Sequence, residues 1–192
     1  YVNDGNGNFI DGSHLLPENK TSGSIVKTND FDNDGDLDLF VGTRHLPHNY
    51  PLSQGSFVYE NVGGRFEDIT QKIVPELTGT GMVTDAVWVD INSDKKIDLV
   101  IVGEWMEPWV FLQNDTGKFT RINNQEIGLD DMSGWWFSVE TDDLDNDGDM
   151  DLVVGNLGNN YKYQATVEQP FKVFTKDFNN SGNTDIVLSY PQ

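Results

Sequence analysis

The segment DFDNDGDLDLFVG, at residues 30–42, decides the fold because it recurs along the chain. It joins a short loop of alternating polar residues to an apolar strand. Three variants, DINSDKKIDLVIVG, DLDNDGDMDLVVG and DFNNSGNTDIVLS, stand at residues 90–103, 143–155 and 177–189. A repeated unit of loop and strand indicates a chain built from similar small sheets packed in series.

A second unit, a strand with an Asn/Gly turn and a Phe, alternates with the first and ends at Phe9, Phe66 and Phe119. The acidic loops start 60, 53 and 34 residues apart, and these Phe residues lie 57 and 53 apart. Such a period is the size of a four-stranded propeller blade. The sequence therefore predicts an all-β fold, with three to four β-propeller blades of four-stranded antiparallel sheets in residues 1–192. The short last interval indicates a compact blade or one without its outer strands.

The apolar runs after the loops predict the inner strands of the blades. Residues 39–41, 99–102 and 152–154 are apolar at every position, so both faces of each strand are expected to be buried between neighbouring blades. Helix is expected to be scarce, with a single turn at residues 69–73.

The charge of the chain is concentrated in the loops. The formal charge is −20, and the four loops hold 15 acidic residues and two lysines, which leaves them with −13 of that total. Like charges packed so densely repel unless a cation neutralises them. A field of this sign also disfavours nucleic acid and anionic membranes as partners. The chain has no Cys and no apolar run near the ~20 residues that span a bilayer.

Side-chain oxygens recur at positions 1, 3, 5 and 9 of the loops at residues 30–38, 90–98, 143–151 and 177–185. With the backbone carbonyl of position 7, they could surround Ca²⁺, which takes six to eight oxygens in irregular geometry. An EF-hand is excluded, because position 12 is apolar instead of Glu. The predicted calcium ligands are Asp30, Asp32, Asp34, Asp36, Asp38, Asp90, Asn92, Asp94, Lys96, Asp98, Asp143, Asp145, Asp147, Asp149, Asp151, Asp177, Asn179, Ser181, Asn183 and Asp185.

The four loops are not expected to bind equally. The loops at residues 30–38 and 143–151 have every expected carboxylate and a Gly at position 6. The loop at residues 90–98 has Lys95 in place of that Gly, and Lys96 opposes a cation. The loop at residues 177–185 has only two carboxylates. The alternative is that these loops are Asp/Asn turns that bond their own backbone, but four copies, each before an apolar strand, favour a metal.

These residues resemble the FG-GAP or VCBS repeats of integrin α-subunit-like β-propellers. Segments 40–70, 86–115 and 134–160 are similar, more narrowly, to bacterial proteins related to cartilage acidic protein, which often carry an ASPIC/UnbV module. The resemblance implies a seven-bladed propeller with Ca²⁺ in its blade loops. Seven blades need about twice this length, so the remaining blades are expected from further sequence or from other chains.

The resemblance also implies a location and a kind of partner. We expect an extracellular or cell-surface protein, secreted or, in a bacterium, periplasmic or attached to the outer membrane. Its partner would be a protein or glycan ligand on a cell surface or matrix. The leading hypothesis is a non-catalytic, calcium-binding recognition or adhesion module. The alternatives are a carbohydrate-binding or carbohydrate-active domain and a structural subunit of an assembly.

Other side chains offer weaker hypotheses. His45 and His48 could form a zinc pair, and Glu104 could be half of a pair of catalytic acids. Arg44 is expected to pair with a carboxylate inside its own blade. Six aromatic residues could stack on sugars or fill the packing between blades, namely Trp105, Trp109, Trp135, Trp136, Tyr161 and Tyr163.

Overall fold

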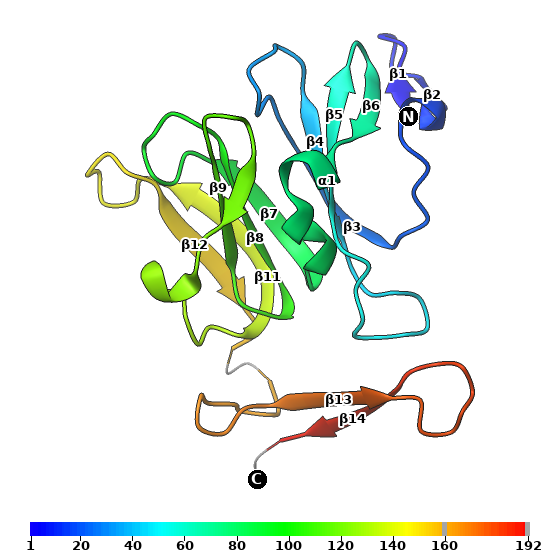
Figure 1. Ribbon diagram of the computed structural model, residues 1–192, viewed down its shortest axis with the longest axis vertical. Helices are drawn as coiled ribbons and strands as arrows, with labels where there is room; N and C mark the ends of the chain where they lie inside the picture. The colour runs from blue at the N-terminus through cyan, green and yellow to red at the C-terminus, as the bar shows by residue number, and fades with distance from the viewer. Residues whose placement is uncertain (159–160, 191–192) are drawn as a thin grey trace.

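The computed structural model describes residues 1–158 and 161–190 and is built almost entirely of antiparallel strands (Figure 1). Two complete four-stranded sheets form its centre. The first joins, in order, β3 (Gly23–Asn29), β4 (Asp38–Thr43), β5 (Phe57–Val62) and β6 (Arg65–Asp68). The second joins β7 (Met82–Val89), β8 (Asp98–Met106), β9 (Trp109–Gln113) and β10 (Phe119–Arg121). These two sheets confirm the predicted blade of four strands, and we call them the first and second blades.

Three further strand pairs correspond to halves of a blade. The hairpin of β1 (Val2–Asn3) and β2 (Phe9–Ile10) matches an outer pair. The hairpins of β11 (Gly134–Asp142) with β12 (Asp151–Asn156), and of β13 (Lys172–Lys176) with β14 (Asp185–Ser189), match inner pairs. The start of β11 also pairs with the end of β8, so the second blade and the β11–β12 pair are joined in one sheet of six strands. Among the described residues, neither β12 nor β14 pairs with an outer strand. The short last interval therefore reflects missing outer strands, not a compact complete blade.

Helix is confined to short turns between strands. One α-helical turn, α1 (Thr70–Ile73), lies where the sequence predicts it. Three 3₁₀ turns are η1 (Ser13–Leu15), η2 (Pro75–Gly79) and η3 (Asn124–Glu126). In the described part of the chain, no helix has the length and apolar character that a membrane crossing requires.

Strand β8 forms the centre of the hydrophobic core. Its residues Leu99 and Ile101 pack with Phe40 of the first blade, whereas Val100 and Val102 pack toward β11. All four β8 side chains are fully buried, and each contributes about 1.5–3 kcal/mol by leaving water. The prediction of inner strands buried on both faces is confirmed here.

The same prediction is wrong for β12. Val153, at the centre of this strand, is 51% exposed. The physical reason is that no further sheet packs on that side of the β11–β12 pair in the described residues. The sequence of β12 is therefore that of a strand buried on both faces, although in the described residues a sheet packs against only one face.

A glycine near the end of β8 permits a close approach of β7. A Cβ atom on Gly103 would lie 2.3 Å from the carbonyl oxygen of Met82, which is too short for any side chain. The strand register shifts at this place, between Val83 and Asp85. The β3–β4 and β11–β12 pairs have equivalent shifts beside Gly42 and Gly155. The repeated Gly thus marks a bulge that all three pairs share.

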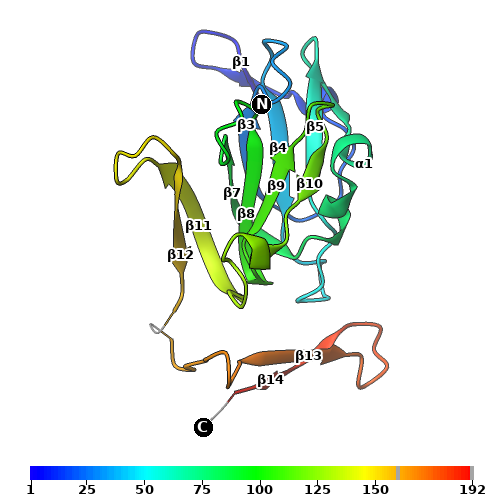
Figure 2. The same ribbon diagram turned by 60° about the vertical axis from the view of Figure 1, so that its left-hand side comes forward.

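The inner strands β3, β7 and β11 lie side by side, and Asp85 on β7 connects them (Figure 2). The ammonium of Lys27 on β3 lies 3.0 Å from Asp85 Oδ1. On the other side, the backbone N–H of Val139 on β11 donates to Asp85 Oδ2 at 3.0 Å. One nearly buried carboxylate therefore joins three inner strands.

The β13–β14 hairpin does not continue this row. In Figures 1 and 2 it lies across the end of the sheets, opposite the loops that precede β4, β8 and β12. Thr184 in its own loop donates to the side chain of Asn49, in the loop after β4, at 2.8 Å. Three acidic loops thus share one end of the molecule, and the fourth lies apart from them.

Candidate calcium sites in the blade loops

All four acidic loops are folded by the same hydrogen bonds. In the first, Asp30 Oδ1 accepts from the backbone N–H of Asp34 at 3.0 Å, and Asp30 Oδ2 accepts from that of Gly35 at 3.1 Å. The position-1 Asp of each other loop makes the same two bonds. The loops therefore do bond their own backbone, as the turn hypothesis states, and this bonding gives all four loops the same shape.

The backbone is left-handed at positions 4 and 6 of every loop. In the first loop, φ is +61° at Asn33 and +97° at Gly35. Lys95 adopts the same conformation at position 6 of the second loop, with φ of +71°. Because a side chain disfavours this region, the second loop has the shared shape at a cost of about 1 kcal/mol.

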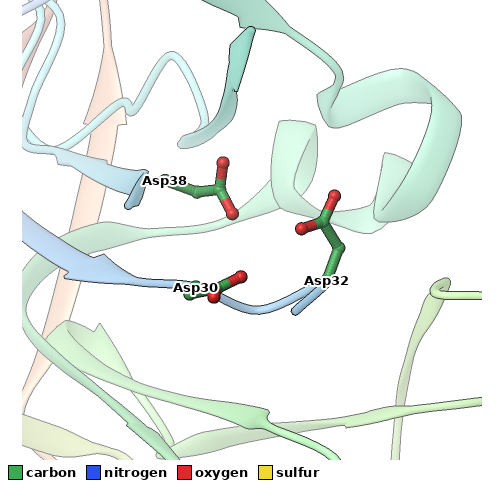
Figure 3. A group of neighbouring side chains, drawn as sticks. All are labelled: Asp30, Asp32 and Asp38. Carbon is green, nitrogen blue, oxygen red and sulfur yellow. The ribbon is translucent and has the colours of Figure 1, made fainter. Parts of the chain in front are cut away.

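Three carboxylates of the first loop converge. Asp30 and Asp32 follow β3, Asp38 begins β4, and Figure 3 shows their oxygens turned toward a common space. One oxygen from each lies within 4.8 Å of the others. Two ligands on opposite sides of Ca²⁺ are about 4.6–5.2 Å apart, so this spacing suits one ion. In the third loop, Asp143, Asp145 and Asp151 make an equivalent group.

Asp38 is the member of the first group that most requires a cation. Its side chain is buried, with Oδ1 accepting from the backbone N–H of Asn61 at 2.8 Å. Its Oδ2 atom is also buried and makes no hydrogen bond of normal geometry among the described residues, although the nearby backbone N–H of Phe31 favours the ionised carboxylate and lowers its pKa somewhat. Burial, together with the charges of Asp32 and Asp34, raises the pKa of Asp38 to about 6. A buried carboxylate oxygen without a well-formed hydrogen bond, beside two further carboxylates, fits a hard cation, so the residues present suit Ca²⁺.

In the second loop the carboxylates have partners within the protein, although burial still raises the pKa of Asp98. Both oxygens of Asp98 accept backbone N–H groups, from Gln113 at 2.8 Å and from Ile91 at 3.2 Å. The ammonium of Lys96 lies 3.0 Å from Asp94 Oδ2 and 3.1 Å from Asp115 Oδ1. Hydrogen bonds from Lys96, first from its backbone, lower the pKa of Asp94. Lys96 thus supplies positive charge that a metal would otherwise supply.

The fourth loop has the shape of the others with less charge. Hydrogen bonds from its own backbone, above all from Gly182, lower the pKa of Asp177. Asp185 Oδ2 accepts from the N–H of Phe178 at 2.9 Å. In the described part of the chain, the two groups of three carboxylates lie only in the first and third loops.

The remaining predicted ligands serve the turn. The position-5 carboxylates of Asp34 and Asp147 each accept from the N–H of position 7, Asp36 and Asp149. They are not members of the two groups of three. Asn92 and Asn179 at position 3 accept from the N–H of position 5. Lys96 and Asn183, at position 7, donate their own N–H to position 5 in the same way.

Sequence reasoning missed the role of position 2. Phe31 is buried and packs on Trp88 and Phe119 of the second blade, at ring-centroid distances of 5.7 and 5.9 Å. Its carbonyl accepts from the side chain of Gln113 at 2.9 Å. Leu144 and Phe178, at position 2 of the third and fourth loops, are exposed. The apolar residue at position 2, present in all four loops, was the available signal.

The structure does not support the zinc pair or the pair of catalytic acids. Within the described residues, no group of three metal-binding side chains includes a His, so His45 and His48 do not form a zinc centre of that kind. Glu104 faces Arg44 in an ion pair, instead of a second carboxylate. Arg44 does pair with a carboxylate, but the prediction that this carboxylate belongs to its own blade is wrong. Arg44 follows β4 of the first blade, and Glu104 belongs to β8 of the second. An ion pair across blades was not accessible from local sequence.

The six aromatic candidates divide into two sets. Trp136 is buried and its indole N–H donates to the carbonyl of Met132 at 2.9 Å, while Trp109 packs under the guanidinium of Arg121 at 3.9 Å. These two side chains are part of the packing between strands and do not line the cavity. Trp105, Trp135, Tyr161 and Tyr163 line a cavity at the other end of the sheets.

Sheet topology and loop geometry define a β-repeat protein of the propeller class. Comparison with family models agrees: the FG-GAP-like repeat model matches residues 30–101 and again residues 90–154. Together the matches cover more than half of the chain, which therefore belongs to the FG-GAP-like repeat family. None of the curated proteins compared with the chain matches it. Repeats of this family are typical of extracellular proteins.

Proposed function

We propose that the chain is a calcium-binding, non-catalytic recognition module that works outside the cell. The observation that carries this proposal is the buried carboxylate of Asp38, which converges with Asp30 and Asp32 and whose Oδ2 atom makes no hydrogen bond of normal geometry among the described residues. Extracellular modules can use sites with a Kd of about 10⁻⁴–10⁻³ M, because Ca²⁺ is abundant there. The family membership and the shared loop geometry support the same role.

The three converging carboxylates of the first loop would each contribute to calcium binding in a different way. Asp30 fixes the turn through two backbone bonds, and Asp32 and Asp38 bring charge from either side. When bound, Ca²⁺ would neutralise the cluster and supply the missing partner of Asp38. Asp143, Asp145 and Asp151 would act in the same way in the third loop, with weaker binding in the second and fourth.

The proposal includes the resemblance to integrin α propellers and to ASPIC/UnbV-related proteins. A seven-bladed ring of the integrin α type, with its other blades from further sequence or other chains, would cover the exposed Val153 face. The ligand would be a protein or glycan on a cell surface or matrix. The relation to ASPIC/UnbV proteins stays a prediction.

Calorimetric titration with CaCl₂ tests the proposal through a matched pair of variants. Asp32→Ala and Asp36→Ala each remove one negative charge from the same loop, but only Asp32 belongs to the converging group. We expect Asp32→Ala to weaken binding at the first loop by at least about tenfold and Asp36→Ala by much less. Asp145→Ala and Asp149→Ala repeat the comparison in the third loop. Equal effects within each pair, or no calcium heat from the unmodified chain, would refute the proposal.

A further inference from the structure

The cavity at the end of the sheets opposite the three acidic loops is a site that the proposed calcium role does not use. It has a volume of about 520 Å³, within the ~300–1,000 Å³ of small-molecule sites. The pairing of β8 with β11 builds it, because Trp135 stands opposite Glu104 in that register. This places Trp135 beside Trp105, with ring centroids 5.1 Å apart.

The aromatic rings of the cavity form a continuous wall. Phe171 stacks on Trp105 at 5.4 Å, and Tyr161 lies 5.3 Å from Trp135. Tyr163 stacks on Phe171 at 5.4 Å. These rings come from β8, β11 and the segment before β13, so the wall exists only in the folded chain.

Trp105 is held in place by features that simple packing does not require. Its φ of +61° is a left-handed conformation that a bulky side chain rarely adopts. Its indole N–H donates to the hydroxyl of Tyr50 at 2.6 Å, from a loop of the first blade. Behind it, Glu104 is fixed by Arg44. Backbone strain maintained by surrounding bonds is frequent at binding sites.

Polar groups stand at the edge of the aromatic wall. Asp131, Ser133 and Asn156 line the cavity with the rings. Asp131 and Ser133 are exposed, whereas Asn156 already accepts the backbone N–H of Gly158 at 2.7 Å through Oδ1, which leaves its amide NH₂ as the group for a ligand. The site thus offers apolar faces beside a carboxylate, a hydroxyl and an amide.

We infer that this cavity binds a carbohydrate through a pyranose ring, an inference that goes beyond the proposed calcium role. A pyranose presents an apolar face of C–H groups, which suits Trp and Tyr rings, and hydroxyls at its edge, which need hydrogen-bond partners such as Asp131 and Asn156. A quaternary ammonium ion would need rings facing one another across the ion. Here neighbouring rings touch, at centroid distances of 5.1–5.9 Å, so they leave no space for an ion between them, and the aromatic surface that remains open includes the 38% exposed Tyr161.

Saturation-transfer NMR on the full chain tests this inference. The probes are the methyl glycosides of glucose, galactose and N-acetylglucosamine, with tetramethylammonium chloride as the cationic probe. We expect saturation of the ring C–H protons of at least one glycoside and none of tetramethylammonium. The signal should vanish in Trp135→Ala and persist in Trp109→Ala, a Trp outside the cavity.

A second matched pair keeps the test decisive if Trp135→Ala fails to fold. Asp131→Asn and Asp130→Asn alter neighbouring acids, of which only Asp131 lines the cavity, and Asn tolerates the φ of +56° at Asp131. We expect Asp131→Asn to weaken glycoside binding by about fivefold or more, and Asp130→Asn by less than about twofold. Binding of no glycoside, binding of tetramethylammonium alone, or equal effects of the two Asn variants would overturn the inference. Calcium titration of the same variants reports separately on the proposed function.

Discussion

At the scale of single residues, Lys96 illustrates how a repeat can replace a bound ion. Its ammonium lies between Asp94 and Asp115, where it balances charge that the first and third loops leave unbalanced. The same residue keeps the backbone carbonyl of position 7, so removing its side chain alters charge without removing a predicted ligand.

We therefore expect Lys96→Ala to raise the calcium affinity of the second loop by about tenfold, because a competing cation leaves Asp94. Calorimetric titration would show an additional or tighter site. Lys20→Ala is the matched control, since Lys20 pairs only with the exposed Glu18, outside the acidic loops. An identical calcium isotherm for Lys96→Ala and the unmodified chain would contradict the role assigned to Lys96.

The raised pKa of Asp38 predicts that the stability of the fold and the calcium affinity of the first loop depend on pH. Its pKa is raised to about 6, above the ~3.9 of an unfolded chain, so the calcium-free fold binds this proton more tightly than the unfolded chain. Its contribution to stability is thus greatest below about pH 4 and is lost as pH rises to about 6. Calcium needs the ionised form, so affinity should rise about tenfold per pH unit up to about pH 6 and then level.

Titrations at about pH 5, 6 and 7 would check this dependence, with the Asp32→Ala variant used to assign the heat to the first loop. Asp38→Asn should lose calcium binding there at every pH. A dissociation constant that does not change between about pH 5 and pH 7 would show that Asp38 is not a ligand.

At the scale of elements, the inner strands depend on one another through Asp85. This carboxylate accepts from Val139 on β11 and pairs with Lys27 on β3 while it belongs to β7. Asp85→Asn removes the charge and leaves the partly buried Lys27 without its partner. We expect a loss of about 2–3 kcal/mol in the free energy of unfolding.

Urea denaturation in saturating calcium would measure that loss. Glu18→Gln, on an exposed side chain, is the control and should change stability by less than about 0.5 kcal/mol. If Asp85→Asn behaves like this control, the contacts of Asp85 do not hold the inner strands together.

The elements also show what a repeat makes predictable. The loops and the inner strands were predictable because spacing within a few residues determines both: Asp30 bonds Asp34 and Gly35, and Leu99 to Val102 are all apolar. The Arg44–Glu104 pair and the separation of Trp105 from Trp109 were not predictable from the sequence. They depend on how one sheet sits against the next, which the spacing of a repeat does not specify.

The position of the β13–β14 hairpin was also beyond the sequence. Its loop matches the other three, yet the hairpin lies across the end of the sheets and contacts Asn49. Local pattern gives the same element in both settings, because the pattern encodes the turn and the strands and not the surface on which they pack.

At the scale of the whole molecule, a charge of −20 makes the fold sensitive to ions in general. With calcium removed, the loops repel one another across the end that three of them share (Figure 1). Chelation should lower the melting temperature. Raising NaCl from about 0.05 M to about 0.5 M should restore part of the loss, because screening shortens the range of the repulsion.

Differential scanning calorimetry with and without chelator, at both salt concentrations, would measure this effect. Salt should restore only part of the loss, since Na⁺ screens charge but does not provide the ligand geometry that Asp30, Asp32 and Asp38 offer. Complete recovery by salt would mean that the loops respond to ionic strength alone.

The burial of Phe31 has a mechanical consequence. Phe31 lies between Asp30 and Asp32 in the chain, yet its ring sits in the second blade against Trp88. A tensile force that pulls the first two blades apart is therefore carried in part by the backbone of this loop, beside the Lys27–Asp85 and Arg44–Glu104 ion pairs. An ion clamped by the residues on either side would stiffen that connection, so the force needed to rupture the junction would follow the calcium concentration around the protein.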